Sequence, residues 1–180
     1  RLHLDGFLCP GHVSAVIGTK AYDFIPKRYK IPCCVAGFEP LDIMEGLYIL
    51  VKQIARKGAE VANQYSRVVT SSGNLSAQEV LKKVFRVSDA LWRGFGVIDN
   101  TGLELKKEFS YFDAAREFGL KPEASLSIPK TRCKCAEVLK GLIRPCDCRL
   151  FARACNPDNP VGPCMVSSEG ACSVYFKYKK

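Results

Sequence analysis

The sequence lacks any long apolar run. No stretch of its 180 residues approaches the roughly 20 apolar residues that a helix needs to cross a bilayer. The first residues also lack a basic segment followed by a long apolar one, which is the pattern of a secretory signal peptide. Neither a membrane-spanning helix nor an export signal is therefore predicted, and we expect no membrane partner and a cytoplasmic location.

The sequence is also poor in histidine. Its two histidines are His3 and His12, so neither lies near the C-terminal cysteines. Pairs of the form C-x2-C, on which structural zinc sites and bacterial ferredoxin clusters are usually built, do not occur. The common zinc-knuckle and ferredoxin patterns are therefore excluded, whereas less regular arrangements of thiolates are not.

Cysteine, in contrast, is plentiful: there are ten, and seven lie between Cys133 and Cys172. In a reducing compartment, clustered cysteines more often bind metal or carry out redox chemistry than form structural disulfides. Twelve residues separate Cys135 from Cys148, or fourteen counted from Cys133, and gaps of six and sixteen residues then lead to Cys155 and Cys172. Widely spaced thiolates can hold a four-iron cluster, because its corner irons take ligands from several directions. The spacing favours an iron–sulfur cluster and leaves zinc, disulfides and buried thiols as alternatives.

The net charge is +9, and the basic residues are scattered along the chain, with the densest groups at 27–30 and 177–180. No RNA- or DNA-binding signature accompanies them. We therefore expect a solvated basic surface and no nucleic-acid partner.

The first 60 residues alternate between strand and helix signals. Residues 2–8 read as a buried strand, and a helix is expected from Val13 or Ser14 until Pro26 ends it. Residues 31–38 form a second apolar run, typical of a parallel-sheet strand, with Cys33 and Cys34 in the core. Pro40 then opens a helix over 40–57, where apolar residues repeat at helical spacing. This alternation predicts an α/β fold.

The pattern is looser after residue 60. Residues 59–69 read as a strand or an extended connection, and a capping box at 76–79 precedes a helix over 80–85. Residues 91–98 and 103–106 suggest a β-hairpin around a turn at 99–102, and a short helix over 111–118 ends at Gly119. A polar linker over 120–132 leads into the cysteine-rich tail, where a helix is expected over 136–140. The predicted domains are 1–119 and 120–180.

Five long motifs resemble the HypD family of hydrogenase expression and formation proteins. They are DGFLCPGHVSAVIG (5–18), AGFEPLDIMEG (36–46), NQYSRVV (63–69), CKCAEVLKGLIRPCDCRLF (133–151) and PVGPCMVSSEGAC (160–172). The resemblance covers essentially the whole chain. It implies part of a Rossmann-like parallel-sheet α/β domain followed by a cysteine-rich domain with a [4Fe-4S] cluster.

The resemblance also implies a function. HypD proteins serve in the maturation of nickel–iron hydrogenase, and with a HypC-type chaperone they form the scaffold on which an Fe(CN)2CO group is assembled. Partners of the HypE and HypF type deliver the cyanide. The family's N-terminal part, with an iron-binding cysteine, is not among these residues, so we do not expect the chain alone to assemble the iron complex. The alternative function is a cluster-linked thiol–disulfide oxidoreductase.

The family's cluster spacing maps onto five cysteines of this chain. The implied ligands are Cys148, Cys155 and Cys172, with either Cys133 or Cys135 as the fourth. The sequence does not decide between the last two.

Four further residues are candidates for the chemistry. Cys164 lies outside the ligand spacing and is either a redox thiol facing the cluster or a buried cysteine. Glu169 lies between Cys164 and Cys172, where it would relay protons or tune the charge of the site, or would be a carboxylate bonded within a turn. His12 lies in a turn between strand and helix, and Glu39 follows a strand end, which is the edge where α/β sheets bind ligands. Asp42 near Glu39 is explained by the helix dipole alone.

Overall fold

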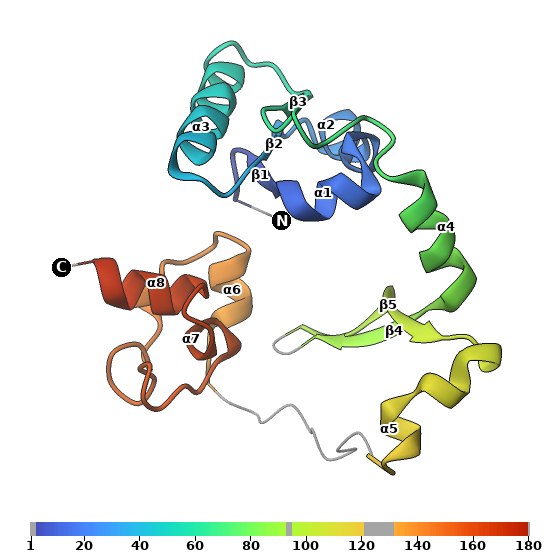
Figure 1. Ribbon diagram of the computed structural model, residues 1–180. Coiled ribbons are helices and arrows are strands. Elements are labelled where there is room, and N and C mark those ends of the chain that lie inside the picture. Colours follow the sequence, from blue (N-terminus) through green and yellow to red (C-terminus); the bar gives the residue numbers. More distant parts are fainter. Residues whose placement is uncertain (1–2, 93–94, 121–131, 180) are drawn as a thin grey trace. The chain divides into compact units, whose positions relative to one another are not determined.

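The computed structural model describes residues 3–92, 95–120 and 132–179. The chain forms two compact units, one of Leu4–Lys83 and one of Val84–Lys180 together with Arg1–His3 (Figure 1). Among the described residues, no helix combines the length and the apolar character that a membrane span requires.

The first unit is built around a small parallel sheet. Three strands lie in the order β1-β2-β3, with Phe7 opposite Cys33 and Cys33 opposite Val61. The α/β prediction with parallel strands is thus confirmed. Its elements are β1 (Phe7–Pro10), α1 (Gly11–Ile17), η1 (Thr19–Tyr22), α2 (Phe24–Tyr29), β2 (Cys33–Ala36), α3 (Pro40–Ala55), β3 (Val61–Asn63) and α4 (Leu75–Val84).

Several boundaries in this unit differ from the predictions. The helix expected from residue 13 or 14 begins at residue 11 and is interrupted at Gly18, and the helix expected over 80–85 begins at residue 75. The first strand begins at Phe7 rather than residue 2, because its partner β2 begins at Cys33 and the preceding Pro32 has no N–H for the ladder. Pro26 does not end a helix. It lies in the first turn of α2, where a missing backbone N–H is tolerated because no intrahelical acceptor is needed there.

The two faces of β2 pack differently. Cys33 and Val35 are fully buried with Cys9, Tyr65 and Val69. The opposite face is covered by α3, whose Gly46 approaches so closely that an added Cβ would lie 2.8 Å from Leu8 and 2.9 Å from Ala36. Cys33 and Cys34 are therefore core residues on opposite faces, as the strand period requires.

Helix α3 has its expected position and Pro40 in its first turn, but its apolar repeat does not face the sheet. The buried positions are Asp42, Gly46, Leu50 and Gln53. Leu41, Met44, Tyr48 and Val51 are exposed. The close contact at Gly46 orients the helix, and this leaves the apolar stripe on the outer side.

The second unit begins with an antiparallel hairpin and continues with short helices. It contains β4 (Phe85–Trp92), β5 (Gly96–Leu105), η2 (Lys107–Phe112), α5 (Ala114–Glu117), α6 (Cys135–Leu139), η3 (Pro145–Asp147), α7 (Pro163–Val166) and α8 (Ala171–Tyr178). The helix expected over 136–140 corresponds to α6. Helix α8 was not predicted.

The predicted hairpin exists, but its turn was placed wrongly. Residues 99–102 lie inside β5 and form an irregularity opposite Ser88–Ala90. Asn100 has a φ of 58°, and its N–H donates to Asp89 Oδ1 at 2.9 Å. The turn-forming residues thus serve a β-bulge, which uses the same left-handed backbone, and the chain reverses between Trp92 and Gly96.

The short helix expected over 111–118 is divided at Asp113, whose carboxylate accepts N–H bonds from Ala115 and Arg116 and begins α5. Gly119 follows with a φ of 60°. Most of the expected linker, residues 121–131, lies outside the described residues, so the domain boundary at 119/120 stays a prediction.

Candidate functional site

The carboxyl ends of the three parallel strands carry the first group of candidate residues. His12 is the second residue of α1, directly after β1, and Glu39 precedes α3 after β2. The His12 ring lies 4.7 Å from the ring centroid of Phe38. The sequence thus placed His12 and Glu39 correctly at one edge of the sheet.

The centre of this edge is an ion pair that the sequence did not predict. Arg67 donates to Asp42 through Nη1–Oδ1 at 2.9 Å and Nη2–Oδ2 at 2.5 Å, and Gln64 Nε2 donates to Oδ1 at 2.8 Å. Arg67 Nη2 also lies 3.4 Å from Glu39 Oε2. The Asp42 side chain is only 8% exposed.

This network explains Asp42 better than the helix dipole does. The hydrogen bonds from Arg67 hold the pKa of the Asp42 carboxyl well below its usual range, and Asp42 raises the pKa of Arg67 in return. The only signal for it was the motif 63–69, which contains both Gln64 and Arg67. The bidentate geometry fixes Glu39 and Asp42 at the sheet edge.

The second group of candidates lies in the second unit, where six cysteines line one small cavity. Cys133 precedes α6, Cys135 begins it, and Cys148 directly follows η3. The other three lie near or in later elements: Cys155 pairs with Phe151, Cys164 lies in α7 and Cys172 in α8. The space that they enclose is about 10 Å³, roughly one water molecule.

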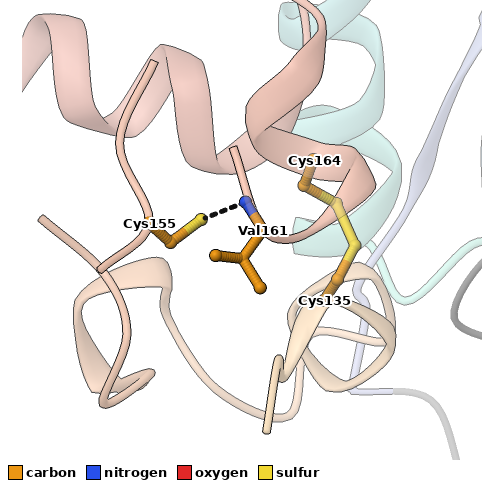
Figure 2. Close-up of a disulfide and its surroundings, with 4 residues drawn as sticks. All are labelled: Cys135, Cys155, Val161 and Cys164. Carbon is orange, nitrogen blue, oxygen red and sulfur yellow. Dashed lines mark hydrogen bonds between the residues drawn. A yellow bond between two sulfur atoms is a disulfide. The ribbon is translucent and has the colours of Figure 1, made fainter. Parts of the chain in front are cut away.

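Two of these cysteines form a disulfide. Cys135 and Cys164 are joined, with their Cα atoms 6.2 Å apart (Figure 2). The Sγ of the nearby Cys155 accepts a hydrogen bond from the N–H of Val161 at 3.4 Å. A Cβ added to Gly162, the next residue, would overlap the Sγ of Cys133. The chain around 161–162 thus packs directly against two of the sulfurs.

The remaining four thiols influence one another. Burial, together with nearby thiolate charge on Cys133, Cys148 and Cys155, raises the pKa of Cys172 to about 11. Several thiolates at one point are unfavourable unless a cation offsets their charge. Iron in a sulfide-bridged cluster is such a cation.

The thiols outside the disulfide therefore suit an iron–sulfur cluster, because thiolates are the usual ligands of such clusters and these thiols line one cavity. These four thiols come from four separate segments: Cys133, Cys148, Cys155 and Cys172. In the part of the chain that the structure describes, however, no three Cys, His, Asp or Glu side chains stand at metal-ligand geometry. The cavity of about 10 Å³ is too small for a cluster, so the thiols would have to lie further apart to hold one.

Glu169 occupies the turn between α7 and α8. Its side chain is exposed and does not line the cysteine cavity, and its backbone N–H donates to Ser167 Oγ at 3.2 Å. A role for its carboxylate stays a prediction.

Comparison with known proteins connects these features. A family model described as "HypD: Hydrogenase formation hypA family" matches residues 1–179. The chain is 46% identical to the hydrogenase maturation factor HypD of Azotobacter vinelandii over 98% of its length and 46% of that protein's. It is also 46% identical to the Escherichia coli K12 protein of that name (98% of this chain, 47% of that one).

The HypD of Rhizobium leguminosarum bv. viciae is 40% identical, over 98% of this chain and 46% of that protein. The chain spans about half the length of the curated relatives it matches. The family match covers both the sheet edge and the six cysteines of the cavity. The chain belongs to the HypD family.

Proposed function

We propose that this chain carries the iron–sulfur centre of a hydrogenase maturation factor. The observation that supports this most strongly is the convergence of six cysteines, from distant points of the sequence, on one cavity. Relatives over 98% of the chain bear the name hydrogenase maturation factor. The cluster, when bound, would supply one-electron transfer.

The proposed ligands are Cys133, Cys148, Cys155 and Cys172. The choice of Cys133 over Cys135 rests on the disulfide, because Cys135 is bonded to Cys164 and is not available as a thiolate. Cys133 also influences the pKa of Cys172, as do Cys148 and Cys155.

The wider function follows from the family. Together with a HypC-type chaperone, the complete protein would be the scaffold on which Fe(CN)2CO is assembled, with cyanide from HypE- and HypF-type partners. In this chain, the sheet edge around His12 and Glu39 is the part that would face such a group. Arg67 and Asp42 would hold Glu39 in position there.

Anaerobic reconstitution with iron and sulfide tests the proposal. We expect about four irons per chain and absorption from thiolate-to-iron charge transfer. Stoichiometric zinc binding without iron uptake would reject it.

The disulfide favours a second, compatible function, a cluster-linked thiol–disulfide oxidoreductase. Cys135 and Cys164 line the same cavity as the four proposed ligands, so an electron would have a short path to the disulfide. Its reduction takes two electrons and two protons and yields two thiols. The variant Cys164→Ser should keep its iron but lose the two-electron thiol–disulfide couple in a redox titration; an unchanged couple would argue against this function.

A further inference from the structure

The cavity with the six cysteines is not equally closed on all sides. Five of its cysteines are buried, but Cys133 is partly exposed. Its outer side borders a separate open groove of about 740 Å³. Of the four proposed ligands, Cys133 is therefore the one that a partner could approach most closely.

The groove beside Cys133 is basic. Arg132, Lys134 and Arg149 line it, together with the carboxylates of Glu137 and Asp147. Both carboxylates are already paired, Glu137 with Lys134 at 2.7 Å and Asp147 with Arg144 at 3.4 Å. Arg132 and Arg149 have no ion pair with any side chain that the structure describes. Two cations thus remain for an external partner.

The segment of the sequence that carries the groove has a net positive charge. Residues 132–180 hold nine Lys and Arg against four Asp and Glu, which gives +5 of the total of +9. A net positive charge on the segment that carries the groove attracts negatively charged proteins. Leu150 adds an apolar contact in the groove.

We propose that this groove docks a small electron-carrier protein with an acidic surface. The inference rests on the proposed function, because it assumes a cluster behind Cys133. The carrier would bind Arg132 and Arg149 and pass its electrons through Cys133. Two reduced carriers would each lose one electron, and with two protons from water the Cys135–Cys164 disulfide would become two thiols.

Nucleic acid is a less suitable occupant of the groove. Only two cations of its wall, Arg132 and Arg149, have no carboxylate partner among the described side chains, and a phosphate backbone would need a longer row of them. A partly exposed cysteine at the groove also has no role in phosphate binding.

Flavodoxin is the probe for the test, because it is an acidic one-electron carrier without iron, so iron analysis reports this chain alone. Binding of oxidised flavodoxin to the anaerobically reconstituted chain is measured by calorimetry. Because salt screens exposed charges over about 10 Å at 0.1 M, we expect the affinity to fall on the order of tenfold between low and moderate ionic strength.

The decisive variants carry a reversed charge. Arg149→Glu and Arg132→Glu should each weaken flavodoxin binding roughly fivefold or more and slow reduction of the cluster by reduced flavodoxin. Their iron content, and cluster reduction by dithionite, should not change. Lys177→Glu, an equal charge change in α8 and outside the groove, should stay within about twofold of the unaltered chain.

The outcomes separate the two proposals. A chain that takes up no iron overturns the proposed function itself. A chain that loads iron and is reduced by dithionite, but binds flavodoxin independently of salt and of Arg149, overturns the docking groove. Displacement of flavodoxin by duplex DNA with higher affinity would assign the groove to nucleic acid instead.

Discussion

The substitution Gly162→Ala adds one methyl group beside the cysteine cavity and so tests how tightly the cavity is packed. Gly162 has φ −107° and ψ 154°, an extended conformation that alanine adopts without strain. The only obstacle is the Sγ of Cys133, which the new Cβ would overlap, whereas ordinary contacts begin near 3.4 Å. The sulfur or the chain at 161–163 must therefore move.

Forcing an extra methyl into a packed interior typically costs about 1–3 kcal/mol, and we expect a loss in that range for the free energy of unfolding. Urea denaturation followed by circular dichroism measures it. The displaced Cys133 should also bind less iron on reconstitution and react faster with iodoacetamide. Gly58→Ala is the matched control, because the nearest obstacle to its methyl is the flexible side chain of Arg56. If Gly162→Ala is as stable as the control variant and loads iron fully, Cys133 does not lie against Gly162.

Three further predictions concern burial and charge. Met165→Ala should lower the free energy of unfolding by about 2–5 kcal/mol in denaturation experiments, because Met165 is 2% exposed and packs among the cysteines; a loss under 1 kcal/mol would contradict that packing. The pKa of Asp42 is lowered by Arg67, so its contribution to stability is complete above its unfolded pKa of about 4 and is lost as the pH falls further. Asp42→Asn should reduce the loss of the free energy of unfolding as the pH falls below about 4. An unchanged loss would count against the ion pair. Burial and the neighbouring Cys33 raise the pKa of Cys9 to about 12, so stability should fall as the pH rises from about 9 towards 12. Cys9→Ala should reduce that slope, and an equal slope would show that Cys9 ionises in the folded protein.

Local signals predicted the parallel sheet well. The continuous apolar run at 31–38 predicted β2, because such a run is typical of a strand that is buried on both faces. Pro40 predicted the start of α3, because proline is favoured in the first turn of a helix. The exposed stripe of α3 was not predictable from its periodicity. Apolar residues occur on both sides of this helix, so tertiary packing at Gly46 decides which side is buried.

Residues that suit more than one kind of structure were harder to assign from the sequence. Asp99–Gly102 suits a hairpin turn and a bulge equally, since both use left-handed backbone, and the strand register selects the bulge. Pro26 likewise suits both the end and the first turn of a helix.

At the candidate site, the sequence indicated which cysteines converge but not which of them pair. The spacing did not show whether Cys133 or Cys135 is the fourth ligand. The disulfide between Cys135 and Cys164 distinguishes them in the structure. The pairing of Arg67 with Asp42 links residues 25 positions apart. No local pattern reports such a contact, because it depends on how the strands are ordered in the sheet.

The central claim is that four thiols, including that of Cys133 and not that of Cys135, hold an iron–sulfur cluster. Iron content and Mössbauer spectra of Cys133→Ser and Cys135→Ser, each reconstituted anaerobically beside the unaltered chain, test it most directly. We expect Cys135→Ser to retain about four irons per chain and a four-iron spectrum, and Cys133→Ser to lose both. A full cluster in Cys133→Ser, with its loss in Cys135→Ser, would contradict the assignment.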